Sequence, residues 1–349
     1  MKAPTLRDVA RLAGVSTTTA SDALGGTGRI APATRLRIAE IADDLGYTGN
    51  VAARRLRRAK TSVIGLYLQT QATELDYFKV LVMSAFHAVN RAGYDLILLG
   101  PRDLSSRTLA GRVDGVLISD PFHGGDPDMG RLFGSNIPIV TIEEPDAALP
   151  PVAGVVTSDH RAVVREMLDT FREGGARRPA FLMTDSSWSS QWAFDVVSAY
   201  EEWCLEHDLT PVKAEVALPA EVAEIDSTVN ALFESCPEID ALFCARDGLI
   251  ARVSGLLRER GRRIGRDIAL ASGDDVPMLP YFYPPIAAID LDPAGYAEQA
   301  VELLVDILEG RERLGARRMH EVYFRDRASA WLGGEPPSVS SSAPAIGLR

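Results

Sequence analysis

A chain of 349 residues, of which 46% are hydrophobic and 24% charged, has the composition of a globular protein with two or three domains. Its formal net charge of −11 is unevenly distributed: residues 1–60 hold 11 Lys/Arg against 5 Asp/Glu, and the remainder holds 26 against 43. A basic head on an acidic body suits a polyanionic partner for the head alone, although a solvated basic extension would give the same charge.

The cysteines and the apolar runs argue against several classes of protein. Cys204, Cys236 and Cys244 are odd in number and lack ligand-like spacing, so we expect a reduced cytosolic protein without disulfides or a zinc site. No apolar segment follows Met1–Thr5, so no signal peptide is expected. No apolar run approaches the roughly 18 residues of a membrane-spanning helix.

Residues 5–58 show the hydrophobic periodicity of an all-α head. Its four short helices are expected at 6–13, 16–24, 32–45 and 50–58. Thr5 and Ser16 suit N-cap positions, Pro32 suits the first turn of the third helix, and Gly46 ends that helix.

From residue 62 onward, strands alternate with helices, a pattern typical of parallel sheets covered by helices on both faces. Strands are expected at 62–68, 94–99, 113–119, 137–142, 179–184, 241–245, 268–272 and 287–289. Helices are expected at 76–91, 159–172, 194–207, 248–260 and 293–309. This length exceeds one doubly wound domain and favours two similar lobes with a cleft between them.

The second helix of the head, Ser16–Leu24, contains an unusual run of Ser and Thr residues, which lower helix propensity. Short hydroxyl side chains at a helix N-terminus can approach DNA closely and hydrogen-bond phosphates and base edges. A small surface helix that begins with cap residues would have the same sequence pattern. The helix alone therefore does not distinguish a DNA-binding helix from an ordinary surface helix.

Residues 5–16 (TLRDVARLAGVS) and the stretches 34–38, 45–47 and 50–56 resemble the N-terminal domain of the LacI/GalR family of bacterial transcriptional regulators. The resemblance continues through 112–116, 137–140, 175–181, 273–275 and 284–286, so it spans nearly the whole chain. It implies a helix-turn-helix head, a hinge helix and an α/β two-lobed periplasmic-binding-protein-like sensor with doubly wound parallel sheets.

The resemblance also implies roles for residues of the head and hinge. The second helix becomes the recognition helix in the major groove, reading bases through Thr17, Thr18 and Asp22, while Arg29 reaches bases or phosphate. The remaining implied DNA contacts are Thr5, Leu6, Ser16, Ser21, Thr34, Tyr47, Asn50, Ala53 and Arg54. Leu56 would wedge between base pairs in the minor groove, with a core leucine as the alternative.

Three positions of the head depart from the family pattern. Asp22 stands where the family usually has Arg, so the operator is expected to be non-standard, since a carboxylate can accept from cytosine N4. Gly49 replaces a common Pro, which would loosen the hinge, and Ala31 replaces a common Ser cap.

For the rest of the chain, the resemblance implies domain boundaries and a ligand site. The expected parts are a head at 1–48, a hinge at 49–60, lobe one at 61–158 plus 287–318, lobe two at 159–286 plus 319–333, and a disordered tail at 334–349. Candidate effector contacts at strand ends are Gln69, Tyr77, Ser119, Asp120, Glu143, Asp159, Trp188, Trp192, Arg246 and Asp274. Core packing remains the alternative for both tryptophans, and a turn-forming role for Asp274.

Two departures leave the effector class open. Arg246 replaces the family's usual Asn or Asp, and Val196 stands at about the position of a frequent sugar-binding Arg. Arg246 could pair with Asp247 or Asp274, or could meet an anionic effector.

We therefore expect a DNA-binding regulator, a homodimer controlled by a sugar-like effector, with no cofactor, no metal and no membrane partner. A transport-type solute-binding protein would share the lobes but lack the head. An enzyme on a doubly wound fold would need a triad, metal or cofactor fingerprint, and none is found.

Overall fold

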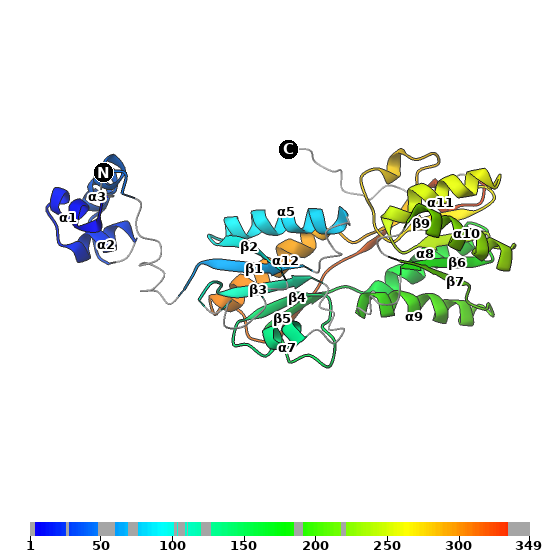
Figure 1. Ribbon diagram of the computed structural model, residues 1–349, viewed down its shortest axis with the longest axis horizontal. Coiled ribbons are helices and arrows are strands. Elements are labelled where there is room, and N and C mark those ends of the chain that lie inside the picture. The colour runs from blue at the N-terminus through cyan, green and yellow to red at the C-terminus, as the bar shows by residue number, and fades with distance from the viewer. Residues whose placement is uncertain are drawn as a thin grey trace. The chain divides into compact units, whose positions relative to one another are not determined.

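The computed structural model describes residues 4–25, 28–47, 60–68, 76–100, 103, 109, 111–119, 127–184, 191–217 and 221–333 (Figure 1). By their internal contacts the residues divide into two compact units, Met1–Ser62 and Val63–Arg349. We call these units the head and the body.

The head contains three helices, α1 (Leu6–Ala13), α2 (Thr17–Leu24) and α3 (Pro32–Asp44). Its core consists of small residues closed by one larger side chain: Val9, Ala10, Ala13, Ala20, Ala23, Ile38 and Ala42. Alanines at these positions let the helices approach closely, and Gly14 ends α1 in the left-handed conformation that permits a sharp turn into α2. The fourth expected helix, 50–58, lies outside the described residues.

Lobe one of the body is built on a fully parallel sheet with the order β11-β5-β4-β3-β1-β2. The strands are β1 (Val63–Tyr67), β2 (Asp95–Leu99), β3 (Gly115–Ser119), β4 (Ile139–Ile142), β5 (Gly154–Thr157) and β11 (Ala316–Met319). Helices α5 (Asp76–Arg91) and α12 (Pro293–Leu308) pack on one face, and α7 (Pro127–Phe133) packs on the other (Figure 1). Side chains of β1, β3 and β4 enter both cores, which is why these strands are continuously apolar.

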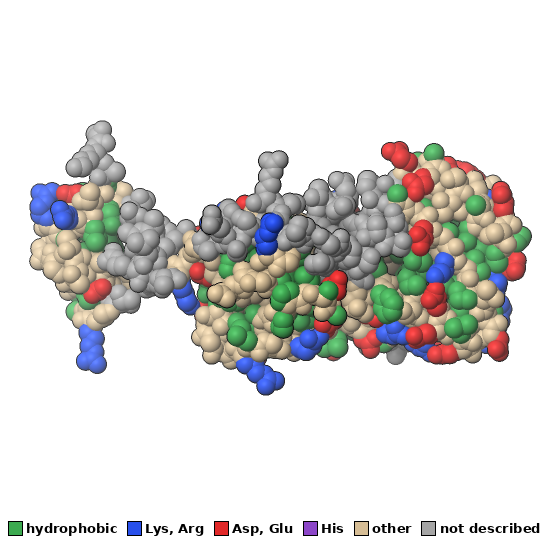
Figure 2. Space-filling model, turned by 60° about the horizontal axis from the view of Figure 1, so that its bottom comes forward, with side chains coloured by type: hydrophobic (Ala, Val, Ile, Leu, Met, Phe, Trp, Pro, Cys, Tyr) green, Lys and Arg blue, Asp and Glu red, His purple; other side chains and the backbone are tan. Residues whose placement is uncertain are grey.

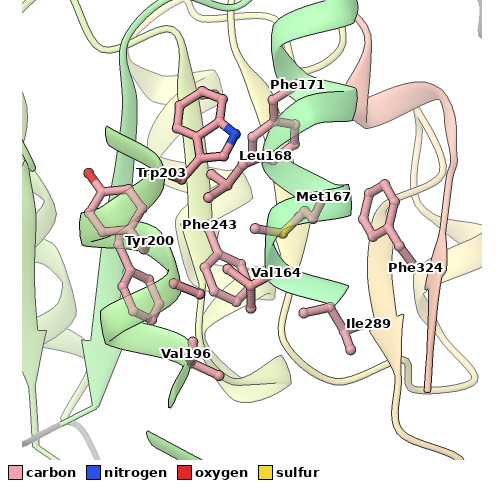
Figure 3. Close-up of a cluster of buried hydrophobic side chains, with 14 of the residues drawn as sticks. Val164, Met167, Leu168, Phe171, Val196, Tyr200, Trp203, Phe243, Ile289 and Phe324 are labelled. Atoms are coloured by element: carbon pink, nitrogen blue, oxygen red, sulfur yellow. The ribbon is translucent and has the colours of Figure 1, made fainter. Parts of the chain in front are cut away.

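Lobe two contains the second sheet, with the order β12-β10-β9-β8-β6-β7. Its strands are β6 (Pro179–Thr184), β7 (Lys213–Val216), β8 (Ala241–Cys244), β9 (Ala269–Ser272), β10 (Ala287–Asp290) and β12 (Tyr323–Arg325), of which β12 is antiparallel to β10. Helices α8 (His160–Glu173) and α9 (Gln191–Glu206) cover one face, and α10 (Val222–Ser235) and α11 (Asp247–Glu259) cover the other. Figure 3 shows Val164 and Met167 of α8 beside Phe243 of β8.

The α/β fold class and the two-lobed arrangement are confirmed, but one lobe boundary is wrong. Strand β10 was expected to open the last segment of lobe one at residue 287, yet Ala287 and Ala288 pair with β9 in the second sheet. The chain therefore returns to lobe one after Asp290. Several elements were also missed, namely α7, β5, β7, α10, β11 and β12.

The turn after β9 sets a strict limit on side-chain size. A Cβ atom on Gly273 would overlap the backbone carbonyl of Ala245, whose neighbour Cys244 accepts a 2.8 Å hydrogen bond from the Gly273 N–H. Gly273→Ala should therefore destabilise the body by roughly 1–3 kcal/mol, the usual effect of overpacking. Urea unfolding followed by circular dichroism measures this change.

Gly248 in α11 provides the control, because a Cβ there meets nothing within 4 Å. Gly248→Ala should leave stability unchanged or raise it by up to about 1 kcal/mol through helix propensity. Equal midpoints for the two variants would show that the Gly273 turn opens without strain.

Candidate DNA-binding face and effector pocket

Helix α2 presents hydroxyl groups at its N-terminus because Ser16 caps it. The Ser16 Oγ accepts a 3.0 Å hydrogen bond from the Thr19 N–H and lies 2.8 Å from the Thr19 hydroxyl. Thr17 and Thr18, the next two residues, are exposed. This arrangement leaves both threonine side chains and the positive end of the helix dipole open to a phosphate or a base edge.

At the start of α1, Thr5 and Asp8 hold one another. The Asp8 carboxylate accepts hydrogen bonds from the Thr5 hydroxyl at 2.7 Å and from the Thr5 N–H at 2.9 Å. Both hydrogen bonds lower the pKa of Asp8, and the bond from the Thr5 hydroxyl has the larger effect. Thr5 is exposed and Leu6 half-buried, so the capping box fixes this helix end at the surface of the head.

The remaining candidates of the head lie at its surface to different degrees. Arg29 is exposed, whereas Ser21, Asp22, Thr34 and Tyr47 are half-buried. A Cβ atom on Gly28 would lie 3.4 Å from the Asp22 carboxylate, so Asp22 stands against the loop between α2 and α3. The hinge candidates Asn50, Ala53, Arg54 and Leu56 lie outside the described residues.

In lobe two, three of the candidate effector residues come together. The Arg246 guanidinium stacks 4.1 Å from the centre of the Trp192 ring, and its Nη1 lies 3.5 Å from the Asp274 Oδ2. Arg246 and Asp274 are both only 4% exposed. Trp192 and Asp274 line a cavity of about 20 Å³ together with His160 and Gly273, which is room for roughly one water molecule.

The topology of the second sheet explains this meeting. Strands β8 and β9 are parallel neighbours, so the residues that follow their carboxyl ends lie side by side. Arg246 follows β8 at the start of α11, and Asp274 follows β9. Ser272 fixes the second turn, because its hydroxyl donates to the Asp274 carbonyl oxygen at 2.8 Å.

The pair of Arg246 and Asp274 is balanced in charge but loosely joined. Its closest recorded approach of 3.5 Å exceeds a normal charge-assisted hydrogen bond. The Arg246 Nε is also buried without a hydrogen-bond partner in the described part of the chain. Because burying an incompletely bonded charge is unfavourable, this guanidinium is suited to gaining oxygen acceptors from a ligand.

Glu143, another candidate effector contact, lies where the two lobes meet. Its Oε1 accepts hydrogen bonds from the Tyr296 hydroxyl at 2.7 Å and from the His160 Nε2 at 2.8 Å, and the residue is 6% exposed. Tyr296 belongs to lobe one and His160 opens the first helix of lobe two, so this carboxylate bridges the lobes. Burial raises the pKa of Tyr296, and the nearby Glu143 charge adds to the effect.

The chain crosses between the lobes around the same carboxylate. Ser158, at the first crossing, donates a 3.0 Å hydrogen bond to the Tyr296 hydroxyl. His320, at the third crossing, stacks on Tyr296 with ring centres 4.3 Å apart and lies 3.2 Å from the Leu291 carbonyl oxygen of the second. Sequence reasoning missed these residues, because an isolated His or Tyr carries no signal until the crossings are known.

The other effector candidates do not join this group. Asp159 caps α8 by accepting a 2.9 Å hydrogen bond from the Ala162 N–H. Tyr77 packs edge-on against Phe78, and the buried Ser119 hydroxyl has no hydrogen-bond partner within the described ranges. Gln69, Asp120 and Trp188 lie outside those ranges.

Known proteins resemble the chain in both parts. Residues 5–50 match the model of bacterial regulatory proteins of the lacI family, and residues 168–330 match a periplasmic binding protein-like domain. The regulator CelR of Thermobifida fusca is 26% identical over 93% of this chain and 98% of its own. A repressor PurR of Photobacterium profundum is 25% identical over 91% and 95%.

Solved structures share the fold. A lac repressor dimer bound to operator and the anti-inducer ONPF is 20% identical, with a TM-score of 0.79 over 95% of this chain and all of that one. A complex of the regulator CelR with cellobiose is 23% identical, with a TM-score of 0.67 over 93% of this chain and 99% of that one.

A helix-turn-helix head followed by a two-lobed body defines a DNA-binding transcriptional regulator. The chain carries a DNA-binding domain of the lacI family of bacterial regulatory proteins, followed by a periplasmic binding protein-like domain. No described helix has the length and apolar character needed to cross a membrane.

The buried pair in lobe two gives a stability test. Arg246→Met should destabilise the body by roughly 3–5 kcal/mol, because the Asp274 carboxylate stays buried without its countercharge. The double variant Arg246→Met/Asp274→Asn should recover more than about 1 kcal/mol of that loss. Urea unfolding of all four proteins of the cycle measures the coupling, and strict additivity would show that the two groups do not interact.

Proposed function

We propose that this protein is a dimeric transcriptional repressor whose head binds an operator and whose body binds a small polyhydroxylated metabolite that changes operator affinity. Its relatives are regulators, and we infer that it acts by binding and not by catalysis. Because its partner is chromosomal DNA, we place it in the cytoplasm. The main support for this proposal is that the same chain has exposed threonines at the N-terminus of α2 and a buried polar pocket in lobe two.

The proposed DNA contact uses α2 as the recognition helix. Thr17 and Thr18 are exposed at its capped N-terminus, and Arg29 is exposed in the following loop. The half-buried Asp22 would accept from a cytosine at the edge of this contact. We assign residues 1–48 to the head, 49–60 to the hinge and 61–333 to the body. Asn50, Ala53, Arg54 and Leu56 would bind the minor groove.

The proposed effector site is the cavity beside Trp192, Arg246 and Asp274. Ligand hydroxyls can donate to the Asp274 carboxylate and accept from the Arg246 guanidinium, and an indole ring suits the apolar face of a sugar. The CelR complex contains cellobiose, which supports a saccharide here. A cavity of about 20 Å³ is too small for such a ligand, so binding requires the lobe-two side chains that line it to rearrange.

Coupling to the head would pass through the crossings between lobes. His160 lines the effector cavity and also bonds to Glu143, which bonds to Tyr296 of lobe one. A ligand that displaces the His160 ring would therefore change the contact between the lobes. Such a change is the kind of small rearrangement that domain rotation amplifies.

The proposed dimer uses an apolar stripe on α5. Val80, Met83 and Phe86 are 42%, 55% and 44% exposed and follow one another at helical spacing. Leu98, on β2 at the edge of the sheet that α5 covers, is 61% exposed. An apolar stripe of this kind on a surface helix indicates a protein contact, and a two-fold axis would pair two copies of it.

The function is tested by fluorescence anisotropy with labelled DNA from upstream of the gene. Specific binding should weaken with salt by a slope of several units, since each neutralised phosphate contributes roughly 0.9. Thr17→Ala/Thr18→Ala should weaken specific binding at least about tenfold and spare binding to random DNA. Thr170→Ala, the same change on α8 of the body, is the control.

The effector is sought in the same assay. Mono- and disaccharides, cellobiose among them, and nucleosides should include a compound that shifts the operator affinity of the wild type and not of Asp274→Asn. If the protein binds neither its own upstream region nor neighbouring upstream regions at low salt, the proposed regulatory function is wrong. A ligand effect that persists in Asp274→Asn would place the effector elsewhere.

The dimer is tested by sedimentation velocity at micromolar concentration. Met83→Glu/Phe86→Glu should convert a dimer into a monomer, because two charges would be buried at each copy of the stripe. Leu205→Glu, at a residue 67% exposed on α9, should remain dimeric. A wild-type monomer, or a dimeric α5 variant, would contradict the proposed interface.

A further inference from the structure

Lobe two carries a concentrated basic segment on an acidic body. Arg258, Arg262, Arg263 and Arg266 fall within nine residues at the end of α11 and in the turn that leads into β9 (Figure 1). Residues 61–349 hold 26 basic against 43 acidic residues, and Figure 2 shows acidic side chains spread over the visible face of this lobe. Such a local reversal of charge attracts anions.

These arginines surround a hollow with an apolar floor. The hollow has a volume of about 540 Å³, which is within the usual range for a small-molecule site. Tyr283, 95% exposed, and Pro284 form one wall, and Ile264 and Ala328 also line it. Charged groups above an apolar floor suit a ligand that joins an anionic group to a flat ring.

The hollow is formed by three segments that are tied together. A Cβ atom on Gly265 would lie only 2.8 Å from the Ala328 carbonyl oxygen and 3.2 Å from Pro284. The Gly265 N–H donates to the Ile268 carbonyl oxygen at 2.9 Å, and the Ser329 N–H donates to that of Pro285 at 3.1 Å. The walls are therefore set by the backbone and need no ligand to assemble.

The four arginines divide into two kinds. Arg263 makes a bidentate pair with Asp267, at 2.7 and 2.8 Å, and Arg262 donates to the Asp267 carbonyl oxygen at 3.1 Å. These two shape the turn. Arg258 and Arg266 are exposed, and the described part of the chain records no ion pair for either guanidinium. They are the two charges available to a ligand.

We propose that this hollow binds an organic phosphate with an aromatic ring, of which a nucleoside diphosphate is the model. The phosphates would lie between Arg258 and Arg266, whose guanidinium groups suit phosphate oxygens, and the base would stack on Tyr283. This site differs from the proposed effector pocket, because it precedes the amino end of β9 whereas Asp274 follows its carboxyl end.

Isothermal titration calorimetry of the full chain with ADP, adenosine and inorganic phosphate tests the proposal. ADP should bind more tightly than adenosine or inorganic phosphate alone. Arg258→Glu/Arg266→Glu should weaken ADP binding at least tenfold. Arg7→Glu/Arg313→Glu changes net charge equally at exposed sites and should bind like the wild type. Tyr283→Ala should reduce ADP binding and leave phosphate binding unchanged.

Asp274→Asn separates this site from the proposed function. This variant should abolish the effector response without altering ADP affinity, so each of the two proposals can be rejected independently of the other. The absence of ADP heat, equal affinity in Arg258→Glu/Arg266→Glu and the wild type, or loss of ADP binding in Asp274→Asn would overturn the proposal. Thermal unfolding of each variant verifies that the lobe remains folded.

Discussion

The two lobes depend on a single buried carboxylate. Glu143 follows β4 of lobe one with a positive φ of 75° and accepts hydrogen bonds from Tyr296 of lobe one and His160 of lobe two. A carboxylate in this environment is stable only while its partners stay in place, because an unbonded buried charge is strongly unfavourable. All three crossings of the chain lie near it, so the relative placement of the lobes is set by short polar contacts.

The polar contacts around Glu143 extend to the proposed effector pocket. From Glu143 they pass to His160, whose ring centre is 6.5 Å from that of Trp192, and from Trp192 to Arg246 at 4.1 Å. Each contact has polar or aromatic character and a limited set of good geometries, unlike the apolar cores on either side. A ligand that competes for one member can therefore shift the others without unfolding a lobe, which is the physical requirement for a transmitted response.

Sequence patterns predicted some of this structure and could not predict the rest. The long amphipathic helix α5 and strand β6 were predicted with the observed bounds, because α5 has a helical period of apolar residues and β6 is a short continuous apolar run. Edge strands β7 and β11 were missed, since KAEV and ARRM are half polar and an edge need not be apolar. Trp192, Arg246 and Asp274 were predicted as candidates near strand ends, and the structure brings these three together. The partners of Glu143 could not be predicted without knowing which segments cross between the lobes.

Charge distribution gives the last constraint on how the parts cooperate. An acidic body repels the DNA backbone, so non-specific binding is confined to the basic head and the body remains free to respond to metabolites. Within that body, Arg246 is neutralised by a buried carboxylate, whereas Arg258 and Arg266 lie exposed at the opposite end of β9. A neutral polyol thus suits the first environment and a phosphate the second. If both proposed sites bind as argued, one lobe would distinguish two classes of metabolite by charge.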